Sequence, residues 1–143
     1  MIGFLIENGN DEQLLQNINQ MNKDNRVMVF SESLVPSIQA NVVQTLEAFH
    51  FNGNVITSSP RLCQQMNHLG YARNRYLYIQ DLFWATLETL HLSQLEQTVF
   101  NKNVSIIANS ATVKTIQNVL NITPKYVMNN HWDINILRQI ANE

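Results

Sequence analysis

The chain has 143 residues, a net charge of −2 and a pI of about 6.0, with 45% hydrophobic and only 14% charged residues. This length suits a single domain with a real hydrophobic core. No surplus of basic residues is present to neutralise a phosphate backbone, which argues against binding of nucleic acid. The chain holds 20 Asn and 12 Gln in place of the missing charges. This composition reflects either drift or a surface adapted to hydrogen bond with sugars or partners.

Several kinds of site are excluded by the residues that the chain lacks. Cys63 is the only cysteine, so no intramolecular disulfide can form, and we expect it to be a small core residue. The four histidines never fall at metal-ligand spacing. The chain contains no G-x-G-x-x-G, no G-K-[ST] and no G-x-S-x-G motif. We therefore predict no metal site and no cofactor.

The N-terminal sequence favours a cytoplasmic protein. Met1 leads directly into a short apolar run, without the basic segment and long apolar stretch of a signal peptide. No run is long enough to predict a membrane span.

Six short apolar runs predict buried strands, at residues 2–6, 27–30, 54–57, 76–79, 104–108 and 125–128. They are apolar throughout instead of alternating, which indicates that helices cover both faces of the sheet. Because β-α-β crossovers are right-handed, this alternation predicts a parallel sheet. We expect one α/β domain over residues 1–143: a doubly wound, mainly parallel, Rossmann-like sheet of about six strands with helices on both faces.

Capping residues and apolar spacing predict the intervening helices. Asn10 or Asp11 could cap the first helix, and Pro36 suits the first turn of the second. Ser59, followed by Pro60, opens the third, and Ser110 is expected to cap a later one. The apolar face of the second helix is predicted to consist of Ile38, Val42, Val43, Leu46 and Phe49. The helix after the fourth strand is predicted to have an apolar face of Leu87, Leu90, Leu92, Leu95 and Val99.

Polar residues follow each predicted strand, and in a parallel sheet these positions meet at one edge. They are Glu7 to Asn10, Ser31 to Ser33, Thr57 to Ser59, Gln80 to Trp84, Asn109 to Thr112 and Asn129 to Asp133. Such amides and hydroxyls would hydrogen bond a neutral polyol, and the two tryptophans could stack on its C–H surface. The same residue types also favour caps and turns, so a purely structural role stays open.

Asp81 is the predicted catalytic residue. It follows an apolar strand in RYLYIQDLFW, residues 75–84, and could act as a general base on a hydroxyl beneath the aromatic cover of Trp84. The residues alone favour the other role, in which Asp81 caps the next helix, predicted to begin near Leu82. His131 also follows a strand, between Asn130 and Trp132, where we favour a structural role.

The order of three motifs, YIQDLFW, VSIIANSATVKTIQNVL and KYVMNNHWD, resembles the N-terminal half of glycosyltransferases of the GT-B fold. The family's fourth-strand region often reads Y-x-x-H/Q-D-x-x-W, to which Gln80 and Asp81 correspond. Ser110 resembles the family's serine at the start of a later helix. The sequence departs from the family in its closing turn, and ENGND stands where a glycine-rich loop is usual.

The resemblance implies an acceptor-binding domain. In this family the N-terminal domain binds the acceptor, whereas the C-terminal domain binds the nucleotide-sugar donor. This chain ends where the donor domain would begin, so a separate donor-domain chain or a homo-oligomer would supply it, or catalysis has been lost. The predicted ligand-binding residues are Glu7, Asn8, Gln80, Trp84, Asn109 and Ser110, with Glu7 and Asn8 assigned by position in the first-strand loop.

The leading functional hypothesis is a stand-alone glycosyltransferase-like N-terminal domain that binds a saccharide or a glycosylated acceptor. Whether it is an enzyme stays open; if so, it would be a glycosyltransferase or one part of it. One alternative is a non-catalytic domain that binds or assembles with proteins through a sheet edge or helix face. Another is a small module that binds nucleotide phosphate at helix N-termini.

Overall fold

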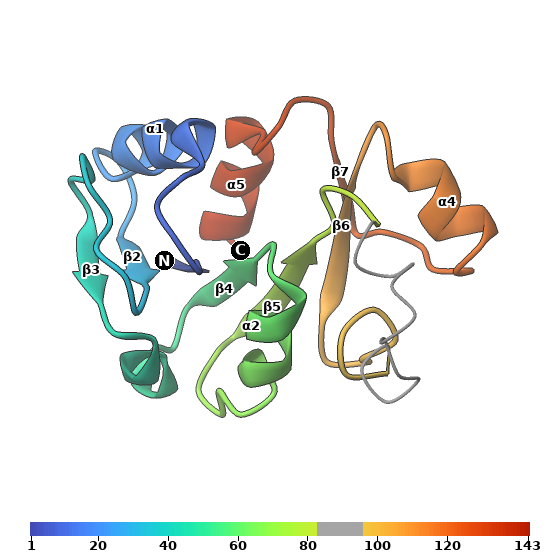
Figure 1. The fold of residues 1–143 in the computed structure, drawn as a ribbon, viewed down its shortest axis with the longest axis horizontal. Coiled ribbons are helices and arrows are strands. Elements are labelled where there is room, and N and C mark those ends of the chain that lie inside the picture. The colour runs from blue at the N-terminus through green and yellow to red at the C-terminus, as the bar shows by residue number, and fades with distance from the viewer. Residues whose placement is uncertain (83–95) are drawn as a thin grey trace.

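The computed structural model describes residues 1–82 and 96–143 (Figure 1). Within these ranges the strands are β1 (Ile2–Leu5), β2 (Val27–Phe30), β3 (Asn41–Val43), β4 (Asn54–Thr57), β5 (Asn74–Tyr78), β6 (Ser105–Asn109) and β7 (Tyr126–Met128). The helices are α1 (Glu12–Met21), α2 (Pro60–Met66), α4 (Val113–Asn118) and α5 (Ile134–Ala141), together with the 3-10 helix η1 (Thr45–His50).

All strands described pair in parallel, in the order β3-β2-β1-β4-β5-β6-β7. The chain starts inside the sheet with β1, the third strand from one edge, and runs outward to β3 at that edge. It then returns to place β4 beside β1, and continues outward in the other direction to β7 (Figure 1). In the register, Phe4 of β1 lies between Val29 of β2 and Ile56 of β4. The prediction of a doubly wound parallel α/β sheet is confirmed, with seven strands in place of about six.

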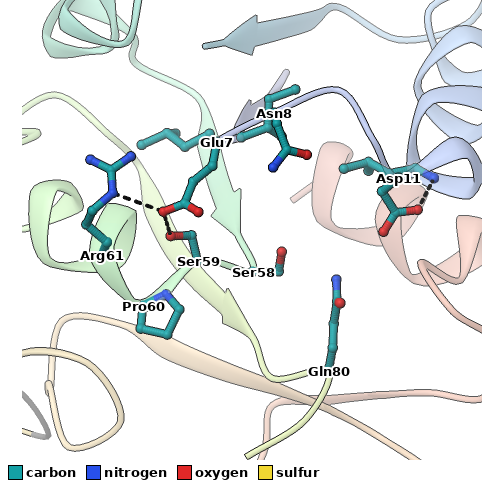
Figure 2. A pocket seen from close by; sticks show the side chains of 11 residues that line it. Glu7, Asn8, Asp11, Ser58, Ser59, Pro60, Arg61 and Gln80 are labelled. Carbon is teal, nitrogen blue, oxygen red and sulfur yellow. Dashed lines mark hydrogen bonds and ion pairs between the residues drawn. The ribbon is translucent and has the colours of Figure 1, made fainter. Parts of the chain in front are cut away.

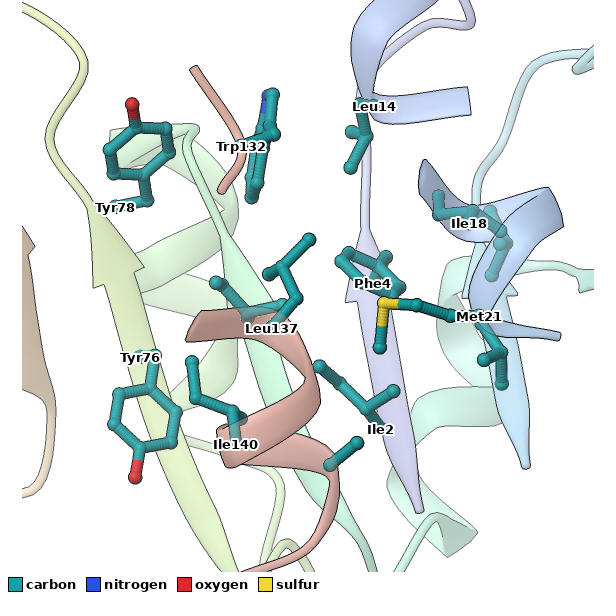
Figure 3. Close-up of a cluster of buried hydrophobic side chains, with 14 of the residues drawn as sticks. Ile2, Phe4, Leu14, Ile18, Met21, Tyr76, Tyr78, Trp132, Leu137 and Ile140 are labelled. Atoms are coloured by element: carbon teal, nitrogen blue, oxygen red, sulfur yellow. The ribbon is translucent and has the colours of Figure 1, made fainter. Parts of the chain in front are cut away.

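Successive residues of each strand face opposite layers, so the sheet has a core on each side. On one side, α1 contributes Leu14, Ile18 and Met21 and α5 contributes Leu137 and Ile140 (Figure 3). These side chains pack on alternate strand residues, which include Ile2, Phe4, Tyr76 and Tyr78. On the other side, η1, α2 and α4 pack on Leu5, Val55, Leu77, Ile106 and Ala108. Cys63 of α2 is fully buried there as predicted, and burial raises the pKa of its thiol to about 12.

The predicted helix after Pro36 is wrong. Asn41–Val43 instead forms the edge strand β3, which pairs with β2, and residues 45–50 form η1. Ser37 has a φ of 60°, a left-handed conformation that interrupts a helix directly after the proline. The two β-branched valines of β3 favour an extended strand, and β3 covers an edge of β2 that would otherwise be unpaired.

Two predicted helix starts are confirmed and a third is wrong. Asp11 caps α1 by accepting a hydrogen bond from the Leu14 amide at 3.1 Å, and Ser59 caps α2 directly before Pro60. Ser110, however, is exposed, and α4 begins only at Val113. The turn is organised by Asn109, whose side-chain oxygen accepts hydrogen bonds from the amides of Ala111 and Thr112, each at 2.9 Å. An Asx turn therefore replaces the serine cap.

The leucine-rich helix predicted over Leu87 to Val99 falls largely on residues 83–95, outside the described residues, although Val99 itself is buried. None of the helices in the described ranges combines the length and apolar character required to span a membrane.

A polar cluster closes the sheet edge opposite to the carboxyl ends of the strands. The hydroxyls of Tyr76 and Tyr126 donate to the carboxylate of Glu143, and Lys125 pairs with the same carboxylate at 3.3 Å. The hydrogen bond to Glu143 raises the pKa of Tyr126 to about 12. These contacts join the segment after α5 to β5 and β7, and each polar group has an internal partner.

Gly53 is expected to be intolerant of even a methyl group. A Cβ at this position would lie 2.7 Å from the Phe51 ring and 2.9 Å from the backbone oxygen of Met1. Gly53→Ala should therefore destabilise the fold by about 1–3 kcal/mol through overpacking. Gly70→Ala is the matched control, because no atom lies within 4 Å of a Cβ there. Urea denaturation of both variants checks this, and equal stability of the two would contradict the packing.

Candidate functional site

A cavity of about 350 Å³ opens at the carboxyl ends of β1, β4 and β5 (Figure 2). It lies where the strand order reverses, between β1 and β4, which is the position at which open α/β sheets bind their ligands. The chain leaves β1 toward α1 on one face and leaves β4 toward α2 on the other, so the two loops separate. The lining residues are Leu5, Ile6, Glu7, Asn8, Asp11, Leu14, Ser58, Ser59, Pro60, Arg61 and Gln80.

One wall of the cavity is an ion pair between the loop after β1 and the first turn of α2. Glu7 Oε1 accepts a hydrogen bond from Ser59 Oγ at 2.6 Å and pairs with Arg61 Nε at 3.0 Å. The bond from Ser59 lowers the pKa of Glu7, and Arg61 lowers it further against the opposing effect of partial burial. Ser59 Oγ also accepts from the Leu62 amide at 3.2 Å, so the helix cap and the wall share one hydroxyl.

Neutral polar groups face the middle of the cavity. Figure 2 shows the amides of Asn8 and Gln80 and the hydroxyl of Ser58 directed toward the same space. The backbone of Gln80 is held in place because its carbonyl accepts a hydrogen bond from Asn109 Nδ2 at 3.0 Å. Asn8 stabilises its own loop by accepting from the Asn10 amide at 3.1 Å. These amides and the hydroxyl supply both donors and acceptors without charge.

The opposite wall is organised by Asp11. Its Oδ1 accepts from the Leu14 amide, whereas its Oδ2 lies 2.8 Å from His131 Nε2 and accepts from Trp132 Nε1 at 3.0 Å. Burial alone would raise the pKa of Asp11, but the hydrogen bonds from His131, Leu14 and Trp132 outweigh burial and lower it. Asp11 is therefore an ionised carboxylate.

His131, which contacts Asp11 of the cavity, lines a second hollow of about 390 Å³. Gln13, Asn17 and residues 130–135 line this hollow. Trp132, one of these residues, is almost fully buried. The expectation that this indole offers a stacking face to a ligand is therefore wrong, because the ring packs against Phe4 and Tyr78 in the core.

The structure brings three of the predicted ligand-binding residues together, since Glu7, Asn8 and Gln80 line one cavity. Asn109 is adjacent through its bond to the Gln80 carbonyl but, like the exposed Ser110, is not among the described lining residues. Asp81 is exposed in the loop after β5 and is not among them either, so its catalytic role stays a prediction. Trp84 lies outside the described residues.

Two important residues of the site were missed by sequence reasoning. Arg61 contacts Glu7 across 54 positions of the chain, and no local pattern signals such a pair. Asp11 was recognised only as a helix cap, and its contacts to His131 and Trp132 span 120 and 121 positions. The position of Asp11 could have indicated a role in the site, because it follows the first strand of a doubly wound sheet, where ligands bind.

Metal binding has no support in the described ranges, where no group of three or more His, Cys, Asp or Glu residues could hold an ion. Comparison of the chain with protein-family models, with curated proteins and with solved structures gives no match.

Proposed function

We propose that the domain binds a saccharide, or the glycan part of an acceptor, in the cavity at the carboxyl ends of β1, β4 and β5. The observation that carries this proposal is the chemistry of the lining. Asn8, Ser58 and Gln80 present uncharged donors and acceptors between two ionised carboxylates, Glu7 and Asp11. Sugar hydroxyls can donate to carboxylates and accept from amide N–H groups at the same time.

Charge disfavours a phosphate-containing ligand in this cavity. Arg61 is the only lysine or arginine among the described lining residues, and its guanidinium is already paired with Glu7. A phosphate would therefore face Glu7 and Asp11 without an uncommitted cation. The volume of about 350 Å³ lies near the lower end of the range for small-molecule sites and suits a small sugar.

The resemblance of YIQDLFW to the acceptor domain of GT-B glycosyltransferases supports the same proposal, because Gln80 of this motif lines the cavity. In that case the nucleotide-sugar donor would bind to a separate chain or to an oligomeric partner. Asp81 is the residue proposed to accept the proton of the reacting hydroxyl, because it follows directly after Gln80 at the end of an apolar strand.

A thermal-shift screen with neutral glycans, nucleotide sugars and free nucleotides tests the proposal. A ligand that binds only the folded state raises the melting temperature, and we expect this from a neutral glycan. Ser58→Ala and Gln80→Ala should each weaken binding about tenfold through loss of a hydrogen bond. Gln117→Ala, an exposed glutamine of α4, is the control. A shift with free nucleotides alone, or equal losses in the control, would refute saccharide binding here.

A further inference from the structure

A second surface feature is a groove between η1 and α2, on the face of the sheet opposite to α1 and α5. It consists of two adjoining hollows of about 540 and 280 Å³, which share Leu46, Phe49 and His68 as lining residues. We call it the η1–α2 groove. Its other lining residues are Leu5, Glu32, Thr45, Glu47, His50, Gln65, Leu69, Gly70 and Tyr71.

The groove exposes more apolar surface than folding alone requires. Leu46 is 70% exposed, Tyr71 69% and Phe49 41%, and all three line the same hollow. Single exposed apolar residues are ordinary, but a contiguous group bordered by polar residues marks an interaction site. Aromatic side chains such as Phe49 and Tyr71 are also enriched at the centres of protein interfaces.

The acidic residues of the groove favour a partner segment with basic side chains. Glu32 and Glu47 line it, and no lysine or arginine does so among the described residues. Neither carboxylate forms an ion pair with any residue of the described ranges. An apolar floor with two uncompensated carboxylates is complementary to a segment that carries leucine-like and basic side chains. An anionic membrane surface would instead be repelled.

We propose that the η1–α2 groove docks a basic amphipathic segment of a partner protein. The apolar side chains of the segment cover Leu46, Phe49 and Tyr71, and its lysines or arginines approach Glu32 and Glu47. Leu5, which is 1% exposed, is the one described lining residue that this docking site shares with the saccharide cavity. The polar residues of the cavity and the exposed residues of the groove are different, so either proposal can fail without the other.

Binding of two synthetic 14-residue peptides, one of leucine and lysine and one of leucine and glutamate, tests the groove by fluorescence anisotropy with the full chain. We expect the Leu/Lys peptide to bind at least about tenfold more tightly. Glu32→Gln with Glu47→Gln should remove most of this preference and flatten the salt dependence. Glu12→Gln and Leu34→Ala change an exposed acid and an exposed apolar residue outside the groove, and should leave binding unchanged.

Gly70→Trp provides a blocking variant. Gly70 lines the groove, and a Cβ there meets no atom within 4 Å, so a side chain can be attached without a clash at its base. The indole is expected to cover part of the groove. It should weaken peptide binding about tenfold while circular dichroism stays native, and Tyr71→Ser should act in the same direction. Equal binding of both peptides, or binding unaffected by Gly70→Trp, would overturn the proposal. So would concentration-dependent dimerisation that Gly70→Trp abolishes, since the occupant would then be a second copy.

Discussion

Trp132→Ala is expected to lower the free energy of unfolding by about 3–5 kcal/mol, near the upper end for single core substitutions. The indole is 1% exposed and packs edge-on against Tyr78, with ring centroids 4.8 Å apart. Its N–H donates to Asp11, and its backbone carbonyl accepts from Asn17. Trp132 also has a φ of 52°, which is rare for a bulky residue and must be held by these contacts.

Urea denaturation followed by circular dichroism measures this loss. Trp132→Phe should lie between the wild type and Trp132→Ala, because it retains an aromatic ring but leaves Asp11 without the indole donor. Val119→Ala is the control, since Val119 is 74% exposed and its truncation should change stability by less than about 0.5 kcal/mol. A loss for Trp132→Ala no larger than that of the control would contradict the described packing.

Asp11→Ala is expected to cost about 2–3 kcal/mol at neutral pH, combining loss of the α1 cap with an unpaired, buried indole N–H. The cost should depend on pH. The pKa of Asp11 is lowered in the folded state, so its stabilisation is fully present above the unfolded pKa, near pH 4, and is lost as the pH falls through the folded value. The stability difference between wild type and Asp11→Ala should therefore narrow below about pH 4.

Asp11→Asn separates the two contributions. Asparagine caps helices about as well as aspartate but carries no charge toward His131 and Trp132. This variant should retain much of the stability at neutral pH and lose most of the acid dependence that Asp11 contributes. Denaturation curves of the three proteins from neutral to acid pH provide the measurement. A difference between wild type and Asp11→Ala that widened toward acid pH would contradict the assignment of Asp11 as an ionised, hydrogen-bonded carboxylate.

The sheet was largely predictable because most of its strands are short, mainly apolar runs. Residues 27–30 and 54–57 were predicted with the bounds that the structure has. Strands buried on both faces need no alternation, and length together with flanking turn residues separates them from helices. The cap of α2 was predicted at Ser59, and the cap of α1 was narrowed to Asn10 or Asp11, of which the structure shows Asp11.

The errors occurred where two local patterns compete. Val42, Val43 and Leu46 fit a helical spacing. The two valines instead lie in a strand that pairs with the edge of β2, and the local sequence does not encode this long-range pairing. Before α4, Ser110 and Asn109 both have side chains that form turns. The side-chain oxygen of Asn109, and not the hydroxyl of Ser110, accepts the hydrogen bonds from the backbone amides of this turn.

The candidate site was predictable in position but not in its contacts. The rule that parallel strands direct their carboxyl ends to one edge is sufficient to bring Glu7, Asn8 and Gln80 together. The Glu7 to Arg61 pair depends on the relative placement of the β1 loop and α2, and the Asp11 to His131 contact depends on how the turn before α5 meets α1. Such long-range geometry is set by packing of the whole domain.

The most direct test of saccharide binding is a nuclear magnetic resonance titration of the isotope-labelled chain with the glycan that gives the largest thermal shift. The proposal predicts saturable changes in the amide signals of Asn8, Ser58 and Gln80, while those of Leu46 and Tyr71 in the η1–α2 groove stay in place. Saturable changes that leave Asn8, Ser58 and Gln80 untouched, or no change at all, would contradict a saccharide site at the carboxyl ends of β1, β4 and β5.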